Sequence, residues 1–272
     1  MSEHVAAPIP EFLITKEYRR FAEFCDSCRR YRYIGLCYGP PGVGKTLSAR
    51  HYANWDLLTP HMDYLATRTA PPAELLAART IFYTPSVTNS PRSIERDIER
   101  LQLGLHWALL DAPKSEGAEM AASDALSKSI ELIVVDEADR LKMSGLEQMR
   151  DIYDQHQSGL IFIGMPGLEK RLARYPQLYS RVGFMHHFRS LGTEELHFIL
   201  QRKWEQLGLT LSADDFTDVE AIAAVTRITN GNFRLLQRLF TQIERILQIN
   251  EIRTVTKEVV ETAREGLVIG PL

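Results

Sequence analysis

Short apolar runs separated by amphipathic stretches give the first prediction of the fold. Runs without polar alternation predict strands that are buried on both faces. They lie at residues 33–38, 80–83, 130–135 and 159–164, with a shorter run at 185–188. Apolar residues recur every three or four positions at 16–32, 91–109 and 146–156. This is the period of helices packed on a sheet, and strands alternating with helices predict an α/β fold with a parallel sheet.

From residue 192 onward the pattern is helical throughout. Helical apolar spacing covers 193–207, 214–227, 232–248 and 256–265, separated by Gly208, Asn230-Gly231 and Asn250. We therefore expect three parts. They are an N-terminal arm and helix at 1–32, an α/β domain at 33–190 and a small helical domain at 191–272. Residues 111–127 contain Ala, Ser, acidic residues and a glycine, and predict a loop or a weak helix.

A glycine-rich segment follows the first predicted strand. It reads Gly39-Pro40-Pro41-Gly42-Val43-Gly44-Lys45-Thr46 and fits the phosphate-loop pattern G-x-x-x-x-G-K-[ST] at every fixed position. Glycines let backbone N–H groups point at phosphate oxygens, and the following helix start adds a favourable dipole. We expect Lys45 to reach the β- and γ-phosphates of ATP and Thr46 to ligate Mg²⁺, with Leu47 completing the nucleotide-binding set. A chance glycine turn between a strand and a helix is the less specific alternative.

The apolar run at 130–135 ends in Asp136-Glu137, the pattern of the second acidic motif of phosphate-loop NTPases. Asp136 is expected to hold Mg²⁺ through water, and Glu137 to orient and deprotonate the attacking water. The letters of Asp136-Glu137-Ala138-Asp139 also name a helicase class. Those helicases use two tandem motor domains, for which this chain is too short.

Composition and charge limit the classes of function. The chain has 272 residues, 44% hydrophobic and 25% charged, as in an ordinary globular protein. Its formal net charge of −3 does not attract nucleic acid to the molecule as a whole, so DNA binding needs a local patch or an assembly. No apolar stretch has the length of a membrane span, and no signal peptide is evident. We expect a cytoplasmic protein with no membrane partner.

Cys25 and Cys28 form a C-x-x-C, and Cys37 is the third cysteine. An odd count without a disulfide framework fits a reducing compartment. A zinc or redox site is one interpretation, although zinc needs two further ligands. The spacing also places Cys25 and Cys28 on one helical face, where buried cysteine is a common small apolar residue, and we favour that interpretation.

Together these features resemble the AAA+ ATPases over residues 16–266. Three segments resemble the transposition regulators of the TnsC, TniB and Mu B type: Val135-Asp136-Glu137-Ala138-Asp139-Arg140-Leu141-Lys142, Met149-Arg150-Asp151-Ile152 and Gly231-Asn232-Phe233-Arg234. The resemblance implies an AAA+ P-loop NTPase with a parallel five-stranded sheet of order 5-1-4-3-2 and a small helical lid. It also implies an ATP-dependent homo-oligomer, ring or filament, that binds double-stranded DNA and recruits a transposase.

The same resemblance implies roles for three arginines. Arg181 matches the finger that completes a neighbouring subunit's site, and Arg234 matches the second sensor arginine of the lid. Arg92 matches a residue that touches the DNA backbone. In one departure from the family, the fourth strand ends in Ile163-Gly164-Met165-Pro166 without the usual polar first sensor. We therefore expect slow, assembly-dependent hydrolysis.

Other functions remain open from the sequence. About 30 residues before the first strand leave no room for the N-terminal helix-turn-helix domain of Mu B, so the minimal TnsC-like form fits better. A helicase loader or replication initiator has the same fold. An ATPase of a secretion or protein-remodelling machine is less favoured, because Tyr83-Thr84-Pro85-Ser86-Val87 lacks an aromatic-apolar-Gly pore loop. A signalling switch without a DNA role is the third alternative.

Overall fold

A computed structural model describes residues 12–62, 72, 75, 77–110, 130–156, 158–212 and 214–267. The segment predicted as a loop or weak helix at 111–127 lies outside these residues, as does most of the predicted N-terminal arm. Within the described part, no helix combines the length and the apolar character needed to cross a membrane.

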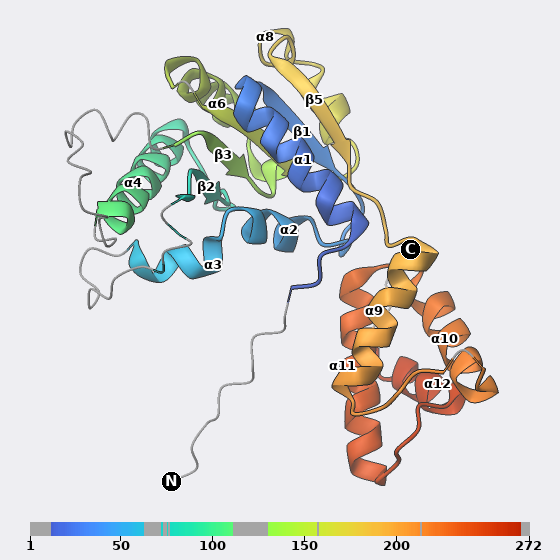
Figure 1. The fold of residues 1–272 in the computed structure, drawn as a ribbon. Helices are drawn as coiled ribbons and strands as arrows, with labels where there is room; N and C mark the ends of the chain where they lie inside the picture. Colours follow the sequence, from blue (N-terminus) through green and yellow to red (C-terminus); the bar gives the residue numbers. More distant parts are fainter. Residues whose placement is uncertain are drawn as a thin grey trace.

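Five strands form one parallel sheet in the order β2-β3-β4-β1-β5, which confirms the predicted order (Figure 1). They are β1 (Ile34–Tyr38), β2 (Thr80–Tyr83), β3 (Leu132–Val135), β4 (Gly159–Gly164) and β5 (Val182–His187). β2, β3 and β4 are buried along their whole length, as their apolar runs predicted. β5 begins before the predicted start at residue 185. Alternate residues of this edge strand are exposed, and Gly183 separates Val182 from Phe184 in its first half.

Helices flank the sheet and continue into a helical C-terminal region (Figure 1). Beside the sheet are α1 (Lys16–Tyr31), α2 (Lys45–Tyr52), α3 (Trp55–Leu58), η1 (Thr59–His61), α4 (Pro91–Leu110), η3 (Ala138–Arg140), α6 (Met143–Gln155), α7 (Leu168–Leu172) and α8 (Pro176–Tyr179). The C-terminal helices are α9 (Thr193–Gln206), α10 (Phe216–Thr229), α11 (Phe233–Asn250) and α12 (Lys257–Glu265).

α1 packs across β1, β4 and β5 and carries the C-x-x-C into the core. Cys25 and Cys28 are fully buried free thiols. A Cβ added to Gly35 of β1 would lie closer than 3.0 Å to Cys28 Sγ, so a glycine is required where the helix meets the strand. No group of three or more His, Cys, Asp or Glu suited to a metal occurs among the described residues. Both thiols pack in the core where α1 meets β1.

The helical region, called the lid below, has its own core. Trp204 packs edge-to-face on Phe240 with ring centroids 5.5 Å apart, and its Nε1 donates to Asp218 Oδ1 at 3.2 Å. The loop before α11 meets the phosphate loop directly. Asn232 Nδ2 donates to Pro41 O at 2.9 Å, and Arg234 N donates to Gly42 O at 2.9 Å. The start of the lid's longest helix is thus fixed against the segment that the sequence predicts to hold phosphate.

Candidate nucleotide-binding site

The phosphate loop connects β1 to α2 in a conformation that needs glycine. Gly42 and Gly44 have φ of +79° and +109°, where a side chain would be strained. Lys45 is the first residue of α2, and its Nζ donates to Gly39 O at 2.6 Å and Pro40 O at 2.8 Å. Burial lowers the pKa of Lys45, while Asp136 and Asp139 oppose that shift. The ammonium therefore lies within the loop, where a triphosphate can replace the two carbonyl oxygens as its partner.

The ends of β1 and β3 bring the predicted magnesium ligands together. Thr46 Oγ1 donates to Asp136 Oδ2 at 2.8 Å. Burial raises the pKa of Asp136, partly opposed by the hydrogen bond from Thr46. A hydroxyl and a carboxylate are hard oxygen ligands, and Mg²⁺ commonly takes one or two such ligands and completes its shell with water and phosphate oxygens. The pair fits that cation.

Glu137 follows Asp136 with φ +50°, an uncommon conformation for a residue other than glycine. Its carboxylate forms an ion pair with Arg140 Nη2. Arg140 Nη1 donates to Pro85 O at 3.0 Å, and Arg140 O accepts from Asn89 Nδ2 at 3.1 Å. The predicted base is thus connected, through one arginine, to the segment between β2 and α4.

One cavity of about 570 Å³ gathers most of the predicted site. Its lining includes Pro41, Gly42, Gly44, Lys45, Thr46, Leu47, Asp136, Glu137, Asp139, Arg140, Gly164, Met165, Phe233, Arg234 and Gln237. The phosphate loop, the acid pair and the lid arginine therefore face the same space. Asp139, Arg140 and Gln237 are residues that the sequence reasoning did not assign to the site.

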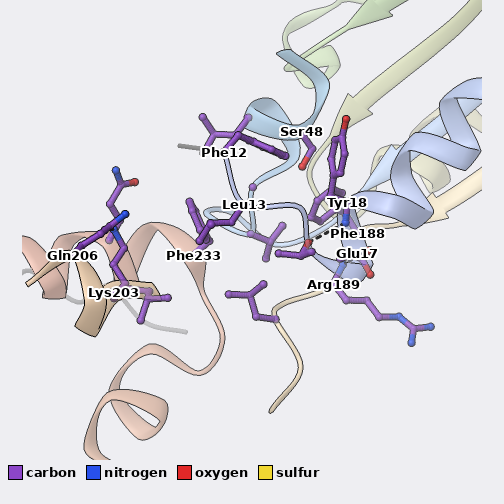
Figure 2. Close-up of a pocket in the computed structure, with 17 residues that line it drawn as sticks. Phe12, Leu13, Glu17, Tyr18, Ser48, Phe188, Arg189, Lys203, Gln206 and Phe233 are labelled. Carbon is purple, nitrogen blue, oxygen red and sulfur yellow. Dashed lines mark hydrogen bonds between the residues drawn. The ribbon is translucent and has the colours of Figure 1, made fainter. Parts of the chain in front are cut away.

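A second, smaller cavity of about 150 Å³ adjoins the phosphate loop at Val43 and Gly44. Figure 2 shows Phe12, Leu13 and Phe233 at this pocket, with Lys203 and Gln206 of α9 at its far side. It shares Gly44, Leu47, Phe233 and Gln237 with the larger cavity. An apolar pocket beside a phosphate site suits a nucleobase.

Arg181 does not line either cavity. It precedes β5, where Arg181 O accepts from Ile34 N at 3.1 Å, at the start of β1. The phosphate loop follows the other end of β1, about 13 Å away at the usual rise of a strand. Arg181 Nε and Nη2 donate to Asp154 Oδ1 and Oδ2 at 2.7 and 2.8 Å. In a single subunit, Arg181 therefore lies at the start of the strands, whereas the cavity lies at their opposite end.

Arg92 also lies outside the cavities, in the first turn of α4. It is exposed, and so are Arg96 and Arg100, which follow at intervals of four residues. Residues four apart share one face of a helix, so the three side chains form a basic stripe. The sequence reasoning named only Arg92, although the spacing of the other two was visible.

Sequence comparison places this arrangement in a family. A model of the AAA domain matches residues 28–172, more than half of the chain. The chain belongs to this family. A potential ATP-binding protein of Staphylococcus aureus is 48% identical to this AAA protein over 270 residues, 95% of this chain and 97% of that protein. The ATP-dependent target DNA activator B of Escherichia phage Mu is 27% identical over 199 residues, 66% of this chain and 53% of that protein. The resemblance to AAA+ ATPases with Mu B-like relatives is thus confirmed.

Solved structures support the same fold. The Thermotoga maritima RuvB Holliday junction branch migration motor has a TM-score of 0.57 at 14% identity, covering 93% of this chain and 70% of that one. The Aeropyrum pernix ORC2 protein in its ADPNP–ADP complexes has a TM-score of 0.58 at 15% identity, covering 94% and 69%. At such identities the likeness shows the AAA+ architecture and nothing about substrate or partner.

Proposed function

We propose that this chain is an ATPase that assembles on double-stranded DNA and regulates transposition by recruiting a transposase to target sites. The contact between Thr46 and Asp136, in one cavity with Lys45 and Glu137, carries the ATPase part. The likeness to a target DNA activator and a DNA transposition protein supports the part that concerns transposition.

The reaction follows from the positions of the side chains. The nucleobase of ATP enters the small pocket, and the phosphates lie on the phosphate loop with Lys45 beside the β- and γ-phosphates. Thr46 and Asp136 would hold Mg²⁺, and the cation would supply positive charge to the phosphate oxygens. A water oxygen bonds to the γ-phosphorus as the bond to the bridging oxygen breaks, and Glu137 takes the water's proton. The products are ADP and phosphate. Glu137 must leave Arg140 to act, since the ion pair engages the carboxylate that takes the proton.

Assembly explains the position of Arg181. An arginine at the end of the strands that is far from the cavity serves catalysis only by entering the site of a neighbouring subunit. Such an interface is head-to-tail, and it closes into a ring or continues as a filament. Arg234 contributes from the lid of the subunit that binds the ATP, because it lines that subunit's own cavity.

DNA binding is assigned to the stripe of Arg92, Arg96 and Arg100. Repeating this stripe in each subunit of an assembly would reconcile DNA binding with a net charge of −3 per chain. Contacts to phosphates give affinity without sequence preference and make binding strongly dependent on salt. Membrane contact has no place in this proposal, and we infer a cytoplasmic location.

A helicase loader or replication initiator is the second candidate. The fold likeness to ORC2 is compatible with it, and such a protein would share the site described above. The partner separates the two: a transposition regulator binds a transposase, whereas a loader binds a replicative helicase. A secretion or protein-remodelling ATPase would be stimulated by protein substrate rather than by duplex DNA.

Electron microscopy with duplex DNA tests the proposal. Wild type is imaged with ADP, with ATP and with a non-hydrolysable analogue. Rings or filaments on DNA are expected only with a triphosphate. Lys45→Ala should not bind ATP and should form none, while Glu137→Gln should bind ATP and keep its assemblies. The absence of DNA association at low salt in every nucleotide state would refute the DNA part, and wild-type hydrolysis by Glu137→Gln would refute the assignment of the base.

A further inference from the structure

The end of β4 holds a glycine where a side chain would face the nucleotide cavity. β4 lies between β1 and β3, and its last residue, Gly164, is paired in register with Tyr38, just before the phosphate loop. A Cβ at this position would lie closer than 3.0 Å to Asp139 Oδ2. The space at the end of the central strand is therefore filled by a carboxylate from another element, the turn η3.

Two contacts fix the position of Asp139. Its Oδ2 accepts a hydrogen bond from Met165 N at 2.7 Å, directly after β4. Its backbone oxygen accepts from Arg171 Nη1 at 2.9 Å. Among the described residues, Oδ1 has no hydrogen-bond partner, and Asp139 lines the same cavity as Lys45 and Glu137. One carboxylate oxygen thus holds the strand end, and the other is without a protein partner on an exposed residue that lines the site.

Hydrolysis needs a second acceptor for the attacking water. The water has two hydrogens, and Glu137 accepts one of them. Until the second hydrogen is also held, the water can rotate about the first bond, and its lone pair is not directed at phosphorus. Misplacement of a reacting group by about 1 Å can cost on the order of 10²-fold in rate. No side chain at position 164 can supply this acceptor.

We propose that Asp139 is the water-positioning residue of this ATPase, with Oδ1 accepting the second hydrogen while Glu137 takes the first as a proton. The inference rests on the proposed ATPase function. Asp139 gains and loses nothing in the step: the water oxygen bonds to phosphorus, the bridging oxygen departs with ADP, and the proton goes to Glu137. The chain thereby replaces the polar residue missing from the end of its fourth strand by one that comes from the turn after its third.

Asp139→Asn separates this role from a purely structural one. The amide oxygen can still accept from Met165 N, so the contact at the end of β4 is kept. The amide NH₂ then takes the place of Oδ1, and it donates to the water instead of accepting from it. That hydrogen bond occupies the lone pair that must attack. We expect kcat to fall about 10- to 100-fold, with the affinity for ATP within twofold of wild type and an unchanged melting temperature.

The control variants use the same change elsewhere. Asp151→Asn removes an exposed α6 carboxylate whose Oδ2 accepts from Gln155 Nε2 at 2.7 Å, and it should behave like wild type. Asp139→Ala removes both roles and should lower the melting temperature as well as kcat. Glu137→Gln reports whether hydrolysis occurs at this site at all.

The outcomes are distinct. Wild-type kcat in Asp139→Asn would overturn the inference, and so would a loss of kcat accompanied by equal losses of ATP affinity or stability, which would make Asp139 a structural contact only. If wild type hydrolyses ATP and Glu137→Gln does not, the proposed ATPase activity at this site stands whatever Asp139→Asn shows. If wild type does not hydrolyse ATP in the presence of DNA, the proposed function itself fails.

Discussion

The guanidinium of Arg181 is held by two hydrogen bonds to the carboxylate of Asp154, which also accepts from Arg150 Nη1 at 2.7 Å. A charged group fixed in this way presents its remaining donors in a defined direction. Arg181→Ala should lower DNA-stimulated hydrolysis by about 10³-fold or more, the usual value of an arginine finger, and leave ATP affinity intact. Arg181→Lys should be nearly as inactive, because an ammonium cannot make the paired bonds of a guanidinium. Turnover and nucleotide-binding assays measure both effects.

Two further variants test whether this arginine acts on a neighbour. Arg174→Ala changes another exposed arginine near α8 and should keep full activity. Mixing Arg181→Ala subunits with Glu137→Gln subunits should restore part of the turnover, since the first supplies an intact ATP site and the second supplies the finger. No recovery in mixtures that form assemblies would show that Arg181 does not act between subunits.

Arg140 holds Glu137 in an ion pair at the edge of the cavity. Partly exposed pairs of this kind contribute about 0.2–1 kcal/mol. Arg140→Gln should therefore free the carboxylate and raise hydrolysis without DNA by about 1.5- to 5-fold, with ATP affinity unchanged. The stimulation of hydrolysis by DNA should become smaller, because Arg140 also connects Glu137 to Pro85 and Asn89, just before α4. A basal rate that falls below wild type would show that Arg140 assists catalysis instead of restraining it.

Much of this site could be predicted because its residues directly follow strands, and each strand is visible in the sequence as a local apolar run. The phosphate loop and Asp136-Glu137 each follow an apolar run, and parallel strands deliver such ends to one edge of a sheet. Asp139 escaped assignment because its role depends on the missing side chain of Gly164, which lies far away in the sequence. The partner of Arg181 was equally hidden, since Asp154 belongs to another helix. The first half of β5 was missed because Gly183 interrupts its short apolar segment and no long apolar run marks this edge strand.

The small base pocket shows the same limit. Phe12 stacks on His51 with ring centroids 3.8 Å apart, and Phe233 approaches from the lid. These residues come from three separated segments, and the local sequence around each of them is that of an ordinary apolar or helical position. Sequence patterns report the period of one element, whereas a pocket between elements depends on how they pack.

Glu17 connects α1 to the segment that leads into the lid, and its charge should stabilise the protein near neutral pH. Burial by itself would raise the pKa of Glu17. The imidazole of His186, whose Nε2 lies 3.1 Å from Glu17 Oε1, the hydrogen bond from Arg189 N and the nearby Arg20 lower this pKa below its ordinary value of 4.5. A carboxyl with a lowered folded pKa stabilises above its unfolded pKa, and that stabilisation is lost as the pH falls through the folded value.

Glu17→Gln should therefore lower the free energy of unfolding by about 1 kcal/mol at pH 7, the difference between a charged and a neutral hydrogen bond. The gap between variant and wild type should stay constant from pH 7 down to about 5.5 and narrow below 4.5. Urea unfolding at several pH values measures it. Glu23→Gln, on the exposed side of α1, should show no such gap. A gap that widens toward acid pH would mean that the carboxyl is not stabilised in its charged form.

The basic stripe on α4 gives a quantitative test of DNA binding. When one arginine no longer touches a phosphate, the slope of log K against log salt concentration should become shallower by about 0.9. Arg92→Ala should therefore weaken duplex binding for all sequences alike and make the slope shallower by about 0.9 per subunit bound. Replacing both Arg92 and Arg96 by alanine should make the slope shallower by about twice as much. Nucleotide affinity should not change, because the stripe does not line the nucleotide cavity. Arg202→Ala, an exposed arginine on the lid, is the matched control. If the variants at Arg92 and Arg96 kept the wild-type slope, the DNA would have to contact another face of the assembly.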